Sequence, residues 1–213
     1  VHPAENKLSA GAAIETLALP KQVTIPLSQH IGAPATAQVS KGDTVKVGTL
    51  IGKGEAFISA NIHSSVSGTV AKVDHSLSIN GYKKLSVIIK VEGDEWEESI
   101  DRSPELKKEI LADKATIISK IKEAGIVGLG GACFPSHVKY MIPEEKKAEY
   151  LIINAVECEP YLTADHRIML ERAEEILVGI EIMKKGLSVD KALVGIEANK
   201  MDAIKHMTTL AKE

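Results

Sequence analysis

The sequence is poor in cysteine, in aromatic residues and in long apolar runs. Its 213 residues include two cysteines, Cys133 and Cys158, and only 3% aromatic side chains. Two cysteines are too few for a disulfide scaffold, and their spacing fits neither a CxxC motif nor a metal site, so a reducing compartment is expected. No stretch approaches the roughly 20 apolar residues of a membrane-spanning helix, and the N-terminal residues lack the layout of a secretory signal.

An excess of one charge is also missing. The chain has 26 basic and 29 acidic residues, a formal charge of −3, and no basic tract that could neutralise a run of phosphates, which argues against nucleic acid as a partner. Hydrophobic residues make up 44% and charged residues 26%, an ordinary globular composition. At this length we expect two small domains rather than one large one.

From residue 23 to residue 91, short apolar runs alternate with glycine turns. This pattern predicts a small all-β barrel or sandwich. Residues 39–48 and 64–70 resemble the two halves of biotinyl or lipoyl carrier domains, which carry a modified lysine on the hairpin between the halves. The tip of that hairpin, residues 54–57, has no lysine, and Lys53 is the nearest amine. A swinging-arm role is therefore not expected, and the barrel is predicted to serve docking or support.

The second half of the chain has a different pattern of apolar and polar residues. Residues 92–102 are acidic and polar, and we place the domain boundary there. Ser103, Pro104 and Glu105 predict a helix start, and apolar residues from Leu106 to Ile121 at three- and four-residue spacing predict one or two helices.

Beyond residue 150 the pattern alternates between strands and helices. Residues 151–154 predict a buried strand, residues 165–185 a helix that Gly186 ends, residues 192–196 a second strand and residues 200–210 a second helix. This order predicts a parallel sheet with right-handed crossovers.

The predicted fold class is therefore α+β with several domains: a small all-β barrel-sandwich, similar to a carrier domain, followed by an α/β parallel-sheet domain. The predicted domains are an N-terminal segment over residues 1–22, the barrel over residues 23–102, and the α/β domain over residues 103–213.

The most unusual local feature is the glycine-rich stretch of residues 125–135. Glycines permit positive φ and a close backbone approach, so such a loop can aim its N–H groups at a phosphate and leave room for a flat ring. A plain tight turn explains the same residues. The loop does not follow a predicted strand, so the dinucleotide fingerprint does not apply. Lys139 lies close by, either to balance a ligand phosphate or to cover apolar surface.

A second candidate feature, residues 154–161, directly follows the first predicted strand of the α/β half. Ligands of open parallel sheets bind outside the carboxyl ends of the strands. Asn154 offers a donor and an acceptor, and Glu157 and Glu159 could accept hydrogen bonds from ribose hydroxyls. Alternatively, the two glutamates are surface acids that cap the next helix.

These two features, about 25 residues apart, resemble the flavin-binding subunit of respiratory complex I, which has a glycine-rich loop followed by an Asn-Ala-x-Glu-x-Glu-Pro stretch. The matching loop residues are Gly128, Gly130, Gly131, Ala132, Phe134, Pro135 and Lys139. The chain departs from that pattern at Leu129, Cys133 and Val156. Residues 25–34, together with His2-Pro3 and residues 5–7, closely resemble the C subunit of the Rnf electron-transport complex.

The resemblance implies an electron-input subunit that passes electrons from NADH through FMN toward two [4Fe–4S] clusters. It would dock on other subunits at the cytoplasmic face of the bacterial inner membrane, without a membrane span of its own. The chain would be a truncated front part that is inactive alone, with the clusters in a later, cysteine-rich region, because each cluster needs four thiolates.

The same resemblance assigns cofactor-binding roles to eight residues and implies no catalytic side chain. Gly128, Gly130 and Lys139 would hold the FMN phosphate and ribityl chain, and Gly131 belongs to the same loop. Asn154 and Glu157 would lie near the flavin, with Phe134 and Glu159 on the nicotinamide side. Two alternatives stay open: a flavin-free homologue, as in the A subunit of the sodium-pumping quinone reductase, and a docking module without catalysis.

Overall fold

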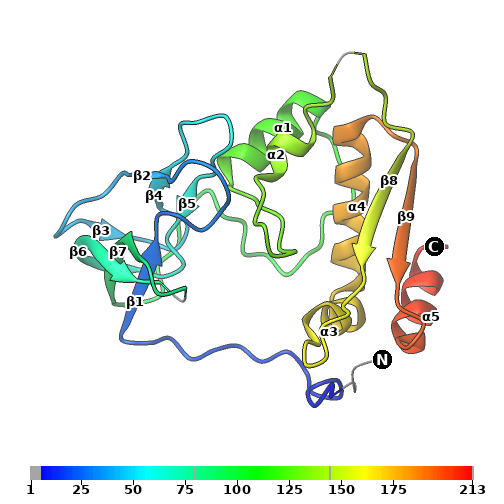
Figure 1. Cartoon of the computed structure of the whole chain (residues 1–213), viewed down its shortest axis with the longest axis horizontal. Coiled ribbons are helices and arrows are strands. Elements are labelled where there is room, and N and C mark those ends of the chain that lie inside the picture. Colours follow the sequence, from blue (N-terminus) through cyan, green and yellow to red (C-terminus); the bar gives the residue numbers. More distant parts are fainter. Residues whose placement is uncertain (1–5, 79, 144, 213) are drawn as a thin grey trace. The chain divides into compact units, whose positions relative to one another are not determined.

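A computed structural model describes residues 6–78, 80–143 and 145–212. His2, Pro3 and Glu5, which contribute to the resemblance, lie outside the described residues. The chain forms two compact units (Figure 1). We call residues 18–104 and 115–142 the barrel unit, and the described residues up to 17, together with 105–114 and those from 143 onward, the sheet unit.

Seven strands build the barrel unit, as the glycine-punctuated pattern predicts. They are β1 (Gln22–Pro26), β2 (Thr36–Ala37), β3 (Thr44–Val45), β4 (Leu50–Lys53), β5 (Ile62–His63), β6 (Gly68–Leu77) and β7 (Lys83–Val91). They form a four-stranded sheet in the order β1-β7-β6-β3 and a three-stranded sheet in the order β2-β4-β5, and all neighbours are antiparallel.

The core between these two sheets consists of aliphatic side chains, which alternate with polar ones along several strands. Leu27, Ile51, Val70 and Ile89 are almost completely excluded from solvent. Burial of each such side chain contributes about 1.5–3 kcal/mol. The barrel unit thus has an aliphatic core of its own.

The barrel unit also contains the two helices that flank the glycine-rich loop. Helix α1 (Lys114–Glu123) precedes the loop, and the single turn α2 (Ser136–Lys139) follows it. Ile117 and Ile121, four residues apart on one face of α1, are buried, in agreement with the predicted helix in this region.

The sheet unit contains two parallel strands and three helices: β8 (Tyr150–Ala155), α3 (Ala164–Glu171), α4 (Ala173–Leu187), β9 (Lys191–Ile196) and α5 (Met201–Leu210). Strands β8 and β9 pair in parallel from Tyr150 opposite Lys191 to Ala155 opposite Ile196. Helix α4 runs alongside both strands (Figure 1). The predicted strand–helix–strand–helix order and the parallel pairing are confirmed.

The prediction of a buried strand at residues 151–154 is correct for the strand but wrong for its burial. Leu151 packs against Ile180 and Val189 and is buried, but Ile152 is 72% exposed and Leu193 on β9 is 56% exposed. Within the described residues, helices cover one face of this strand pair, so apolar side chains that point to the other face stay in solvent.

The predicted helix start at Ser103–Glu105 is also wrong, since residues 103–113 contain no helix. This segment instead makes contacts with α4: Lys185 Nζ donates to the Ile110 carbonyl at 2.6 Å, and Lys108 forms an ion pair with Glu174. Tertiary contacts of this kind override a weak local helix preference.

The single predicted helix over residues 165–185 is divided in the structure. The backbone leaves the helical region at Arg172, between α3 and α4. Gly186 does not end the helix but is buried inside α4, and Ser188 adopts the left-handed conformation that ends it. The left-handed position at a helix end is usually glycine. The helix end was therefore predicted at Gly186, two residues before Ser188.

We predict that Gly68→Ala severely destabilises the barrel unit. Gly68 has φ of +148°, and a Cβ there would lie 2.0 Å from the Lys90 carbonyl oxygen across the sheet. Gly42→Ala is the matched control, since its φ is +95° but a Cβ meets nothing within 4 Å. Denaturant unfolding should show a loss of more than about 3 kcal/mol for Gly68→Ala and about 1 kcal/mol for Gly42→Ala. Equal losses would contradict the steric explanation.

Candidate functional site

The glycine-rich loop is a closed hairpin that rises from the end of α1. The Gly128 N–H donates to the Phe134 carbonyl at 2.9 Å, and the Ser136 N–H donates to the Ile126 carbonyl at 2.9 Å. At the tip, Gly131 has φ of +98° and Cys133 has φ of +48°. Only glycine adopts such values without strain, so Cys133 is held in a costly conformation by the closed base of the loop.

The tip of this loop offers backbone donors to an outside group. Within the described residues, none of the N–H groups from Leu129 to Phe134 has a hydrogen-bond acceptor. A Cβ on Gly130 or Gly131 would meet no atom within 4 Å, so the space above the loop is open. Free backbone N–H groups of this kind are available to donate to an anion.

Lys139 places a cation beside this loop. Its ammonium lies 2.6 Å from the position that a Cβ on Gly128 would occupy, so the missing side chain at Gly128 makes room for it. Five of the eight predicted cofactor-binding residues therefore belong to one continuous structure: Gly128, Gly130, Gly131, Phe134 and Lys139.

The barrel holds the base of the glycine-rich loop. Asn61 donates from its side chain to the Glu123 carbonyl at the end of α1, 3.0 Å away. A Cβ on Gly125 would lie 2.1 Å from the Asn61 carbonyl oxygen, so the backbone at Gly125 approaches the backbone at Asn61 too closely for any side chain. On α2, buried His137 forms a hydrogen bond with the Phe57 backbone, and burial followed by the nearby Lys122 charge lowers the pKa of His137.

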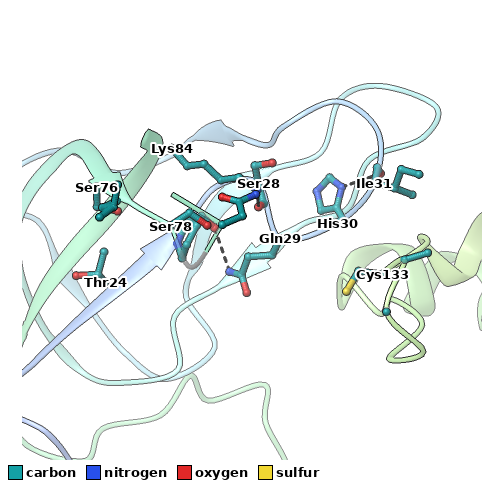
Figure 2. Close-up of a pocket in the computed structure, with 14 residues that line it drawn as sticks. Thr24, Ser28, Gln29, His30, Ile31, Ser76, Ser78, Lys84 and Cys133 are labelled. Atoms are coloured by element: carbon teal, nitrogen blue, oxygen red, sulfur yellow. Dashed lines mark hydrogen bonds between the residues drawn. The ribbon is translucent and has the colours of Figure 1, made fainter. Parts of the chain in front are cut away.

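A pocket of about 720 Å³ lies between one face of the barrel and the glycine-rich loop (Figure 2). Gln29, His30 and Lys84 line its barrel side, and Cys133 lines its loop side. The Ala60 N–H donates to His30 Nε2, and His30 Nδ1 faces the Ile31 carbonyl at 3.1 Å. Both ring nitrogens of His30 therefore have backbone partners in the wall of the pocket.

The second candidate feature is the turn after β8, which we call the site turn (residues 154–162). Asn154 sits at the exposed carboxyl end of β8, and its side-chain oxygen accepts from the Val156 N–H at 3.1 Å. Glu157 is buried, and its carboxylate accepts the N–H groups of Asp165 at 2.7 Å and His166 at 3.4 Å. It therefore caps α3, as the alternative explanation of the sequence suggested, but from a buried position rather than from the surface.

Two lysines that the sequence analysis did not single out for this site hold the site turn from below. Lys7 Nζ donates to the carbonyls of Glu157, Glu159 and Leu162, and buried Lys200 Nζ reaches the same Glu157 carbonyl at 3.3 Å. Lys200 also pairs with Glu197. Lys7 lies about 150 residues away in sequence, so no local pattern could connect it with this turn.

The acids around the site turn are crowded, and nearby donors offset the crowding. Burial, and then the Glu157 carboxylate, raise the pKa of Asp165. The hydrogen bond from Lys200 lowers the pKa of Glu197, and the Lys7 charge acts in the same direction. The hydrogen bond from the Ala203 N–H lowers the pKa of Asp202, with a further contribution from His166 at 2.9 Å.

The predicted site residues thus form two groups. The glycine-rich loop group belongs to the barrel unit, and Asn154, Glu157 and the exposed Glu159 belong to the sheet unit. In the described part of the chain, no cluster of three or more His, Cys, Asp or Glu side chains could hold a metal ion. None of the helices described is both long and apolar enough to cross a bilayer.

Comparison with known families defines the class of protein. Residues 1–94 match the RnfC barrel sandwich hybrid domain, and residues 121–213 match the Nuo51 FMN-binding domain. The chain therefore joins a barrel of the RnfC type to a flavin-binding domain of the complex I type. The two matches confirm the resemblance to the C subunit of the Rnf complexes, which is the name that the curated relatives carry.

Curated relatives from three bacteria agree with this membership. The C subunit of the proton-translocating ferredoxin:NAD(+) oxidoreductase complex of Clostridium ljungdahlii is 46% identical over 97% of this chain. The Na(+)-translocating counterpart of Acetobacterium woodii is 44% identical over 87% of the chain, and the C subunit of the ion-translocating oxidoreductase complex of Rhodobacter capsulatus is 43% identical over 98%. The chain spans 45%, 42% and 40% of these relatives, less than half of each.

We predict that Glu157→Gln destabilises the sheet unit, because an amide cannot accept both N–H groups of α3 as a carboxylate does. The neighbouring Glu159→Gln is the control, since that side chain is exposed. Thermal unfolding should show a loss of about 1–2 kcal/mol for Glu157→Gln and less than about 0.5 kcal/mol for Glu159→Gln. Identical melting curves for the two variants would show that the cap is unimportant.

Proposed function

We propose that this chain is the flavin-binding part of an electron-input subunit, in which hydride passes from NADH to FMN and single electrons continue to [4Fe–4S] clusters elsewhere in the protein. The observation that carries the proposal is the run of free N–H groups from Leu129 to Phe134, in the loop whose Gly128 makes room for the Lys139 ammonium. Backbone donors and a positive charge both stabilise a bound phosphate. The match of residues 121–213 to an FMN-binding domain supports the same assignment.

In this proposal the flavin supplies the hydride and single-electron chemistry, and the protein supplies orientation and charge. Gly130 and Gly131 leave the space above the loop open, Gly128 makes room for Lys139, and the Lys139 ammonium balances the phosphate charge. The half-buried Phe134 closes the hairpin through its carbonyl and presents its ring near the loop. These residues hold the cofactor, and none of them transfers a proton.

The site turn is assigned to the flavin ring and the nicotinamide. Asn154 and Glu159 are exposed at the carboxyl end of β8, where ligands of parallel sheets bind. The Glu157 carboxylate is already used by two N–H groups of α3, so we assign it the role of shaping the turn near the flavin.

We retain residues 1–22, 23–102 and 103–213 as the proposed functional divisions of the chain.

The direction of electron flow depends on the partner rather than on this site. The Clostridium and Acetobacterium relatives are named ferredoxin:NAD(+) oxidoreductases, which describes flow toward NAD+. A hydride site that accepts from NADH also donates to NAD+, since both directions share one transition state. The proposed partners are the other subunits of the membrane complex, at the cytoplasmic face of the membrane.

Comparison of FMN with riboflavin tests the assignment of Lys139, because the two flavins differ only in the phosphate. Lys139→Gln in the whole subunit should weaken FMN binding about tenfold and leave riboflavin binding unchanged, which is the effect of losing one charge-assisted contact. Lys120→Gln on the exposed side of α1 is the control. Flavin fluorescence titration measures both affinities.

Equal loss of FMN and riboflavin affinity in Lys139→Gln would contradict a phosphate contact. Failure of the wild-type subunit to bind either flavin would contradict the proposed function and favour a flavin-free docking or assembly subunit.

A further inference from the structure

Three main-chain carbonyls of the site turn converge on one ammonium group, that of Lys7. The distances from Lys7 Nζ are 2.9 Å to the Glu157 oxygen, 2.6 Å to the Glu159 oxygen and 2.7 Å to the Leu162 oxygen. An ammonium has three donors and no acceptor, so each donor is used. The backbone of the site turn therefore curls around a single side chain.

The N-terminal segment that carries Lys7 is itself fixed to the sheet unit. The Asn6 N–H donates to the Pro160 carbonyl at 3.1 Å, and Ser9 Oγ lies 2.7 Å from Thr163 Oγ1. Arg167 on α3 donates to the Ala10 carbonyl at 3.0 Å. Further along, the Ile14 N–H donates to the Glu171 carboxylate at 3.1 Å.

These contacts are made along the whole of residues 6–14, on both sides of Lys7. The position of its ammonium is thus set by the segment rather than by the flexible side chain alone.

The site turn has no substitute for Lys7 among the described residues. Lys200 also reaches the Glu157 carbonyl, but its ammonium is paired with Glu197 and makes no contact with the carbonyls of Glu159 or Leu162. Without Lys7, these two carbonyls, which lie at the surface, would have water as their only partner. The part of the turn that carries the Glu159 side chain would then lose its fixed course.

We propose that Lys7 is a positioning residue for the nicotinamide side of the flavin site, which makes the N-terminal segment a working part of the sheet unit. The proposal rests on the proposed function, because it assigns the site turn to the nucleotide. Lys7 touches neither the cofactor nor the substrate. It acts by fixing the backbone from which Glu159 projects, while the glycine-rich loop holds the phosphate of FMN independently.

The test compares Lys7→Met, which keeps the length of the side chain but removes its donors, with Lys7→Arg and with Lys41→Met, an exposed lysine of the barrel unit. Hydrogen exchange of the whole subunit, measured without cofactor, reports on the site turn directly. We expect the amides of residues 156–163 to exchange about tenfold faster in Lys7→Met and at the wild-type rate in Lys41→Met. Arginine should restore part of the protection, because its planar fork cannot meet three converging carbonyls.

Kinetics separate positioning from general stability. With ferricyanide as electron acceptor, Lys7→Met should raise the KM for NADH about tenfold while the Kd for FMN changes less than about threefold. Amide exchange at the wild-type rate in Lys7→Met would show that Lys7 does not hold the site turn. Faster exchange with unchanged NADH kinetics would overturn the positioning role. Parallel losses of FMN and NADH affinity would also overturn it, by showing a purely structural effect.

The proposed function can fail separately. A wild-type protein that binds no FMN would refute the flavin site and with it the positioning role, while the exchange rates would still decide whether Lys7 holds the turn.

Discussion

The backbone carbonyls and N–H groups that follow β8 need hydrogen-bond partners, and the sheet unit depends on this constraint. The chain leaves a parallel strand there and reverses into α3, which leaves carbonyls without strand partners and N–H groups at the start of a helix. Backbone groups of this kind must find a partner in the protein or in water. Lys7 and Lys200 pair the carbonyls, and the Glu157 carboxylate pairs the N–H groups. The same solution places exposed Asn154 and Glu159 at the end of the strand, so the stability of the turn and the geometry of the candidate site have one cause.

The barrel provides the corresponding support for the glycine-rich loop. In carrier domains, the hairpin between the two halves presents a modified lysine. Here the equivalent connection between β4 and β5 is bound to other parts of the barrel unit: Ser59 donates to the Ala33 carbonyl, the Ala60 N–H donates to His30, and Asn61 donates to the end of α1. A hairpin held at three points is suited to carrying a rigid loop.

Most of the architecture could be predicted from the sequence because it depends on local patterns. Alternating apolar residues and glycine turns predicted the barrel, and short apolar runs predicted β8 and β9. The errors arose where distant parts of the chain decide the outcome. Contacts with α4 keep residues 103–113 out of a helix, and Ile152 is exposed because no element among the described residues covers its face. The end of α4 at Ser188 required a backbone conformation that its residue type does not favour.

The candidate site shows the same division. The glycine-rich loop was recognisable because a run of glycines carries its own conformational signal, and Lys139 follows within the same stretch. Lys7 and Lys200 were missed because a lysine that binds carbonyls has no sequence signature, and Lys7 is brought to the turn only by the fold. Glu157 was recognised, but its burial and the use of both its oxygens by α3 depend on the packing of the turn.

We propose that the glycine-rich loop receives the phosphate end of the flavin through its free backbone donors. Hydrogen exchange of the whole subunit with and without FMN tests it most directly, because the free N–H groups of residues 129–134 would become donors to the ligand. We expect strong protection of those amides on FMN binding. Protection confined to other regions, with residues 129–134 exchanging at the same rate in both states, would contradict it.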